Sequence, residues 1–139
     1  MARYAGQMEI ALTRAGHVAV AVPADRVAGV RRGEGDDDEV PRLSLASCLG
    51  LAAPGARPAS RFLQVMTEGG AYELGVDGKV EIRRVELASL HRLPELVSDL
   101  GPRIGISGLL ELDDGLVFFI DLDVMTRWAL RDREVRGES

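Results

Sequence analysis

The segment from Arg103 to Arg131 constrains the fold more than any other part of the chain. Its apolar residues up to Leu112 predict a β-strand, Asp113-Asp114-Gly115 predicts a reversal, and the five apolar residues Leu116–Ile120 predict a second strand. An unbroken apolar run is typical of a strand that is buried on both faces. We therefore expect a buried hairpin that leads directly into the residues that follow.

Those residues predict a helix that begins after Asp121. The Asp121 carboxylate is placed to accept from the free amides of the first turn, and Asp123 adds negative charge at the positive end of the helix dipole. Leu122, Met125 and Ala129 fall on one stripe, which we expect to face the core. Trp128 lies on the flank of this stripe and either seals the core, the interpretation we favour, or stands partly exposed as an anchor for a partner.

Length and composition predict one domain over residues 1–139. A chain of 139 residues with 46% hydrophobic residues is long enough to bury one core and too short for two independent domains. Only 4% of residues are aromatic and 16 are glycine, so we expect an aliphatic core and frequent turns. Both features favour a mostly β fold.

The net charge of −5 is a local feature of the sequence. Five acidic residues lie between Glu34 and Glu39, and the other 17 acidic residues equal the 17 Lys and Arg in number. The balanced remainder offers no basic stripe, so we expect neither a nucleic acid nor a membrane as partner. The sequence shows no signal peptide and no run long enough to span a membrane, and we expect a soluble cytoplasmic protein. The acidic run itself is expected to be a solvated loop.

No constellation of residues predicts catalysis, a metal or a cofactor. Cys48 is the single cysteine and lies in an apolar stretch, where we expect it to be buried and structural. His17 and His91 lack ligand-like spacing, no serine lies in a nucleophile elbow, and there is no phosphate-binding glycine motif. The acidic pairs have structural explanations in turns, helix caps and the charged loop. We therefore expect a protein that is not an enzyme.

The rest of the chain predicts short strands joined by turns. Gln7–Thr13 and Val18–Val22 flank Gly16 and predict a hairpin. Ala52–Ser60 predicts a connector, and Leu93–Leu100 a loop or a single helical turn. Further strands are expected at 27–32, 40–43, 62–66, 72–76 and 79–85, which brings the total to about nine strands in an antiparallel meander that closes into one or two small barrels.

A weak internal repeat accompanies these strands. Ser44-Leu45 follows one strand and Asp121-Leu122 follows another, and in both places a capping residue precedes a leucine. The repeat predicts two halves of similar build, over residues 7–51 and 61–131.

The chain from Arg61 onward resembles the CheW family, the scaffold proteins that join bacterial chemoreceptors to the histidine kinase CheA. The resemblance is carried by Leu74–Ile82, by Pro94–Val97 and above all by Gly105–Asp123, where a glycine-led strand, an acidic turn and a hydrophobic strand run into an aspartate-leucine helix start. The first half resembles the family more loosely, through Val20–Arg32 with its valine-x-x-valine element and through Pro41–Leu51.

The resemblance implies two small intertwined SH3-like five-stranded β-barrels with a C-terminal helix. It implies an adaptor of a bacterial chemosensory system that couples a chemoreceptor tip and CheA by protein binding, without cofactor or catalysis. The family binds the receptor in the groove between the barrels and CheA at the barrel ends. By matching positions, the groove residues are Val27, Val30, Phe62 and Ile82. The alternative is a CheW-fold domain that serves as a structural or regulatory subunit of another complex, such as a motility machine.

Three departures from the family pattern bear on these expectations. The family's asparagine-x-arginine-glycine segment before Pro41 is missing, which should reduce the first barrel by about one strand and leave a free edge that invites homodimerisation. Ser44 replaces an aspartate and keeps the capping function. Glu73 replaces a glycine near the groove, where a carboxylate would be costly to desolvate against an apolar receptor helix.

Overall fold

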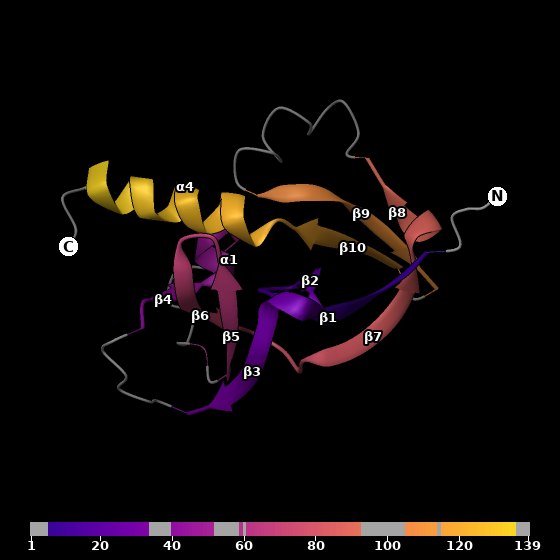
Figure 1. The fold of residues 1–139 in the computed structure, drawn as a ribbon, viewed down its shortest axis with the longest axis horizontal. Coiled ribbons are helices and arrows are strands. Elements are labelled where there is room, and N and C mark those ends of the chain that lie inside the picture. The colour runs from indigo at the N-terminus through magenta and orange to yellow at the C-terminus, as the bar shows by residue number, and fades with distance from the viewer. Residues whose placement is uncertain are drawn as a thin grey trace.

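In the residues that it describes, the computed structural model shows two β-sheets and two α-helices (Figure 1). It describes residues 6–33, 40–51, 59, 61–92, 105–113 and 115–135, with side chains in the last helix as far as residue 129. The acidic run, most of the connector after Ala52 and the predicted loop at Leu93–Leu100 lie outside these residues. The elements are β1 (Gln7–Ala15), β2 (Val18–Pro23), a 3-10 turn η1 (Ala24–Arg26), β3 (Val27–Arg32), β4 (Arg42–Ser44), α1 (Leu45–Cys48), β5 (Arg61–Thr67), β6 (Gly70–Val76), β7 (Glu81–Glu86), a 3-10 turn η2 (Leu87–Ser89), β8 (Leu90–His91), β9 (Ile106–Leu112), β10 (Gly115–Ile120) and α4 (Leu122–Val135).

The mostly β fold is confirmed, but its strands do not form a simple meander. Sheet A has the order β7-β1-β2-β10-β9-β8, and sheet B has the order β3-β5-β6-β4. Most neighbours are antiparallel, as alternating hairpin sequences favour, but β2 pairs with β10 and β4 pairs with β6 in parallel. These two pairs join strands far apart in the sequence, so local turn signals could not reveal them.

The two halves of the chain are intertwined. The β1–β2 hairpin joins the late strands β7 to β10 in sheet A, whereas β5 and β6 join the early strands β3 and β4 in sheet B. Among the described residues, sheet A has one strand more than the five expected from the family, and sheet B has one fewer. The reduced first barrel therefore matches the loss of the segment before Pro41.

Two hydrophobic clusters form the core. The sheet A cluster takes side chains from all six strands of that sheet, among them Ile10, Val85 and Leu110, so the sheet must curve around it. The central cluster lies on the other face of sheet A and is shared with sheet B, α1 and α4; Val20, Leu63 and Met125 belong to it. Burial of aliphatic groups in these two clusters is the main source of stability.

Local signals placed several elements correctly. Gly16 has a φ of 64° in the β1–β2 turn, a conformation that glycine adopts without strain. The Ser44 hydroxyl accepts from the Ser47 amide at 3.1 Å and caps α1. The Asp121 carboxylate accepts from the amides of Asp123 and Val124 at 3.0 and 3.2 Å and caps α4. All three positions were predicted from residue type and spacing.

Three burial predictions need correction. Leu116–Ile120 is not buried on both faces. The first residues of β10 are exposed to solvent, and Leu116 among them is 62% exposed. Trp128 is 38% exposed and does not seal the core, since the core-facing stripe of α4 runs through Leu122 and Met125. Cys48 packs against the central cluster but is only half-buried.

Candidate protein-binding surface

Val27 and Val30 lie on the same face of sheet B. Residues three apart in a regular strand point to opposite faces, but the register of β3 shifts between Val27 and Gly29, where a bulge inserts one residue. Val27 therefore pairs with Val65 and Val30 with Leu63, and both partners belong to the central cluster. Val27 packs against that cluster, whereas Val30 is 48% exposed.

Ile82 takes a similar place in the other sheet. It pairs with Ala11, a buried residue of the central cluster, so its side chain lies on the central-cluster side of sheet A. β7 is one edge strand of sheet A and β3 is one edge strand of sheet B, and both lie at the lower side of the view in Figure 1. Ile82 is 55% exposed. Val30 and Ile82 thus extend the apolar interior to the surface at the margins of the two sheets.

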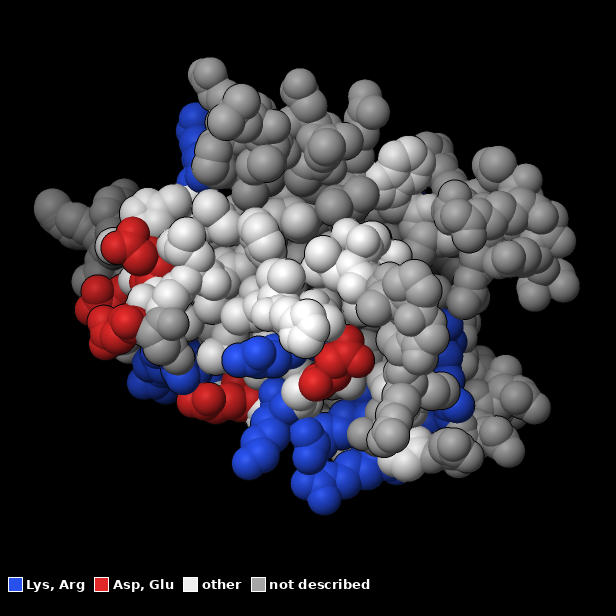
Figure 2. All heavy atoms as spheres, turned by 180° about the vertical axis from the view of Figure 1, so that it is seen from behind, with Lys and Arg blue, Asp and Glu red and all other residues white. Residues whose placement is uncertain are grey.

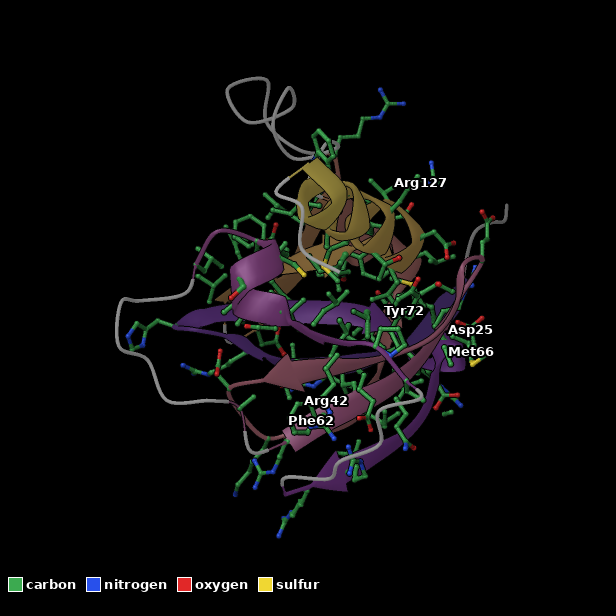
Figure 3. All side chains as sticks on the ribbon, turned by 90° about the vertical axis from the view of Figure 1, so that its left-hand side faces the viewer. Asp25, Arg42, Phe62, Met66, Tyr72 and Arg127 are labelled. Atoms are coloured by element: carbon green, nitrogen blue, oxygen red, sulfur yellow. The ribbon has the colours of Figure 1, made fainter. Side chains whose placement is uncertain are left out.

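Phe62 does not join this apolar margin. It pairs with Arg31 and therefore lies on the face of sheet B opposite to Leu63 and the central cluster. The guanidinium carbons of Arg42 and Arg31 lie 4.9 and 5.8 Å from the centroid of its ring. Figure 3 shows Arg42 and Phe62 on the side of the sheet away from α4, while Tyr72 lies on the α4 side. The structure thus brings Val27 and Val30 together and separates Phe62 from them.

A buried carboxylate organises the face on which Phe62 lies. Arg31 donates to Glu73 through two nitrogens at 2.6 and 2.8 Å, and Arg42 donates through Nε at 3.0 Å. Glu73 itself is only 3% exposed. The hydrogen bond from Arg31 is the main cause that lowers the pKa of Glu73; burial acts against it, and the hydrogen bond from Arg42 adds to the lowering. We call Arg31, Arg42, Phe62 and Glu73 the arginine cluster.

The arginine cluster was not predicted from the sequence, although one signal for it was present. Glu73 interrupts the apolar strand that runs from Tyr72 to Val76, and a buried acid in such a strand needs a cationic partner. The cluster also changes the expected role of Glu73, whose side chain points away from the face that carries Val30. Two guanidinium groups offset the free-energy cost of removing the Glu73 carboxylate from water. The carboxylate does not lie on the face where the receptor helix was expected.

Other carboxylates hold elements together. Asp123 accepts from the Glu68 amide at 2.8 Å and pairs with Arg26 at 3.3 Å, which ties the start of α4 to the β5–β6 turn and to η1. Asp77 accepts from the Gly16 amide at 2.7 Å and links two turns. Within the described part of the chain, no group of three or more His, Cys, Asp or Glu is arranged to hold a metal ion.

A pocket of about 360 Å³ opens at the end of sheet A where β10 begins. Leu12, Ala19 and Val117 contribute apolar surface to its lining, and Arg14, Lys79 and Glu81 contribute charge. Its size falls within the range of small-ligand sites. The described residues that line it include no cysteine, histidine or serine, so a covalent nucleophile with a histidine base is not assembled there.

The described helices include none that is both long and apolar enough to cross a membrane. The longest, α4, has 14 residues and bears charged side chains in its first turns.

Comparison with known proteins identifies the fold. No protein-family model matches the sequence, and no curated protein matches it either. Among solved structures, the chain is similar to the scaffolding protein TtCheW from Thermoanaerobacter tengcongensis, with a TM-score of 0.68 and 16% sequence identity over 86% of this chain and 92% of that one. The chain therefore has a divergent CheW-like fold.

Proposed function

We propose that this protein is an adaptor of a bacterial chemosensory system, acting by protein binding and not by catalysis. It would couple a chemoreceptor tip to a CheA-type histidine kinase in the cytoplasm, and residues 1–139 would act as one domain. The fold shared with a scaffolding protein supports this proposal. The observation that carries it is the pair of exposed aliphatic side chains, Val30 and Ile82, at the margins of the two sheets.

Val30 and Ile82 keep apolar surface in contact with water in the free protein, which is unfavourable in free energy. Each leaves about half of its surface in water, whereas its cross-strand partner on the same face, Leu63 for Val30 and Ala11 for Ile82, is buried. A receptor helix that covers them would remove that apolar area from water, a contribution of about 25 cal/mol for each Å² covered. The central cluster beneath them provides a packed floor, which is the setting in which apolar anchors contribute most to binding.

Substitution of Ile82 tests the proposed surface. We expect Ile82→Asp to weaken binding of a receptor-tip fragment by at least about tenfold in titration calorimetry, because the carboxylate would have to be desolvated. The melting temperature should change little, since Ile82 is 55% exposed. The matched control is Leu116→Asp, which places the same charge at another exposed leucine or isoleucine position on sheet A, at the pocket end.

Two results would contradict this assignment. If Ile82→Asp unfolds the protein, Ile82 belongs to the core. If Leu116→Asp weakens receptor binding as much as Ile82→Asp, the receptor does not select the margin that carries Val30 and Ile82.

A second candidate function is a structural or regulatory subunit of another complex, such as a motility machine. It is favoured by the arginine cluster, which gives one face of sheet B a charged surface in place of an apolar one. A folded protein that binds neither receptor tip nor CheA regulatory domain would support this second function over the first.

A further inference from the structure

The pocket at the end of sheet A combines an apolar floor with a charged rim. Its apolar lining includes Val117, which is buried in the sheet A cluster, and Leu12 and Ala19, which pack against that cluster. Three exposed charged residues form the rim, namely Arg14, Lys79 and Glu81. The mouth of a curved β-sheet is a common position for a small-molecule site, and such sites are mostly apolar with a few polar groups that orient the ligand.

The strand register places these side chains on one face of sheet A. Glu81 pairs with Leu12, and Arg14 pairs with Ala19. Residues directly opposite each other share a face, so all four lie on the face that carries the sheet A cluster. Ile82 lies on the other face of β7. The pocket is therefore separate from the apolar margin proposed to bind a receptor.

Hydrogen bonds between two loops fix the wall of the pocket. The Asp77 amide donates to the Arg14 carbonyl at 3.0 Å, and the Gly16 amide donates to the Asp77 carboxylate at 2.7 Å. A Cβ atom on Gly78 would lie 3.3 Å from Cβ and Cγ of Arg14, so the aliphatic part of the Arg14 side chain packs against the Gly78 backbone. A wall that is held in this way does not have to be ordered by the ligand, which lowers the entropic cost of binding.

The rim of the pocket has an excess of positive charge. Arg83 donates to Glu81 through Nε and Nη2 at 3.2 and 3.4 Å, so the acidic residue of the rim already has a cationic partner. Neither Arg14 nor Lys79 forms an ion pair with a carboxylate of the described residues. Figure 2 shows Lys and Arg side chains gathered along the lower edge of the molecule, the edge near which β7 begins in Figure 1. Positive charge around a concave site attracts anionic ligands.

We propose that this pocket binds a small organic acid, with its carboxylate between Arg14 and Lys79 and its aliphatic chain on Leu12, Ala19 and Val117. At the volume of about 30 Å³ that a water molecule occupies in the liquid, the pocket of about 360 Å³ has room for about a dozen non-hydrogen atoms. A monocarboxylate with a short aliphatic chain fits this space and matches both the floor and the rim. The proposal does not depend on the proposed adaptor function.

A titration with hexanoate tests the proposal, with binding measured from amide chemical shifts in ¹H–¹⁵N spectra at constant ionic strength. We expect saturable shifts at the amides that line the pocket. Acetate has the charge without the chain and should bind at least about tenfold more weakly. Hexylammonium has the chain with the opposite charge and should bind at least about fivefold more weakly. Equal binding of acetate would overturn the role of the apolar floor, and equal binding of hexylammonium would overturn the selection of anions.

Matched variants test the role of the two cations. Arg14→Met and Lys79→Met together keep the aliphatic part of each side chain and remove its charge, and we expect hexanoate affinity to fall by at least about fivefold. The control is Arg84→Met, at an exposed arginine that pairs with Glu9 and lies on the face of β7 away from the pocket. This control should leave the affinity unchanged. An equal loss in the control would show that the overall charge of the protein, and not the pocket, attracts hexanoate, and would overturn the assignment.

Two further measurements locate the ligand. Ala19→Leu fills the floor of the pocket and is expected to abolish the hexanoate shifts in a protein that still unfolds cooperatively; persistence of the shifts would overturn the site. Lys79 is the only lysine in the sequence, so ¹³C-dimethylation labels one lysine side chain and keeps its charge. In the otherwise unmodified chain, its signal should shift with the same saturation as the amides. A lysine signal that does not respond to hexanoate would place the ligand elsewhere and contradict the proposal.

Discussion

Among the acidic residues that the structure describes, Glu73 departs most from the environment of an ordinary surface acid. It is almost completely buried, yet three hydrogen bonds from Arg31 and Arg42 satisfy its carboxylate. A buried ion pair contributes little net stability compared with an apolar pair, but removal of one partner leaves uncompensated charge. The two arginine side chains are 28% and 31% exposed, so water can solvate them again in part.

The first prediction concerns the loss of this carboxylate. Glu73→Gln keeps the shape of the side chain and removes its charge, and we expect the free energy of unfolding to fall by about 2 kcal/mol. Urea denaturation measures the change. Glu68→Gln, at an exposed acid that lies 4.0 Å from Arg127, is the matched control and should have an effect below about 0.5 kcal/mol. Equal effects of the two variants would show that burial does not decide the contribution of Glu73.

The second prediction concerns pH. The pKa of Glu73 in the folded protein lies below its value of 4.5 in the unfolded chain, so ionised Glu73 stabilises the fold at pH values above 4.5. This contribution is lost as pH falls from 4.5 through the lowered pKa. The difference in unfolding free energy between the natural protein and Glu73→Gln should therefore shrink over that range. A difference that stays constant or grows on acidification would contradict the lowered pKa.

The start of α4 depends on two features, a cap made by a residue next to the helix in the sequence and a tertiary contact with a glycine far from it in the sequence. Asp121 caps the helix, as its residue type and position predict. Gly105 lies against the first turns of the helix with a φ of 99°, and a Cβ atom there would meet the Met125 Cβ at 2.6 Å and its backbone nitrogen at 2.9 Å. Gly105 and Met125 are far apart in the sequence, so the spacing of residues could not predict that they are in contact.

The third prediction separates capping from charge at Asp121. Asp121→Ala should destabilise the protein by about 1 kcal/mol, whereas Asp121→Asn should cost less because asparagine also accepts from helix amides. Chemical denaturation of the two variants measures the difference. If asparagine proves as costly as alanine, the charge of Asp121 and not its hydrogen bonds would be the stabilising feature.

The fourth prediction separates backbone strain from steric clash. Gly105→Ala and Gly115→Ala both place a Cβ at a positive φ, of 99° and 137°. The strain alone should cost about 1–3 kcal/mol at each site. A Cβ on Gly115 would have open space around it, so Gly105→Ala should be clearly the more destabilising in thermal denaturation. Equal losses would contradict the close packing of Gly105 against α4.

The sequence predicted elements well where the signal was local, and poorly where pairing decides the outcome. The β1–β2 hairpin and both helix caps depend on residues that are close in the sequence. By contrast, Phe62 and Leu63 are adjacent apolar residues, and only the register with β3 shows that Leu63 faces the core while Phe62 faces the arginines. The bulge that brings Val27 and Val30 to one face is likewise invisible in the sequence.

In the whole molecule, the internal repeat gives two sheets that share one hydrophobic cluster, and the proposed binding residues lie at the margins of these sheets. The weak likeness of Ser44-Leu45 to Asp121-Leu122 corresponds to β4–α1 and β10–α4, the two equivalent strand–helix units. The intertwining of the repeats places the two sheets around a shared central cluster. That cluster lies beneath the margins that carry Val30 and Ile82. Exposed aliphatic side chains above a packed interior are suited to the protein binding proposed for this chain.

The most direct test of the central claim is the mass of the complex that this chain forms with a receptor-tip fragment and the regulatory domain of a CheA-type kinase, measured by light scattering after size-exclusion chromatography. An adaptor that couples receptor and kinase is expected to give one species that contains all three components, and Ile82→Asp is expected to abolish this species. A folded chain that elutes alone, with neither the receptor fragment nor the kinase domain bound, would contradict it.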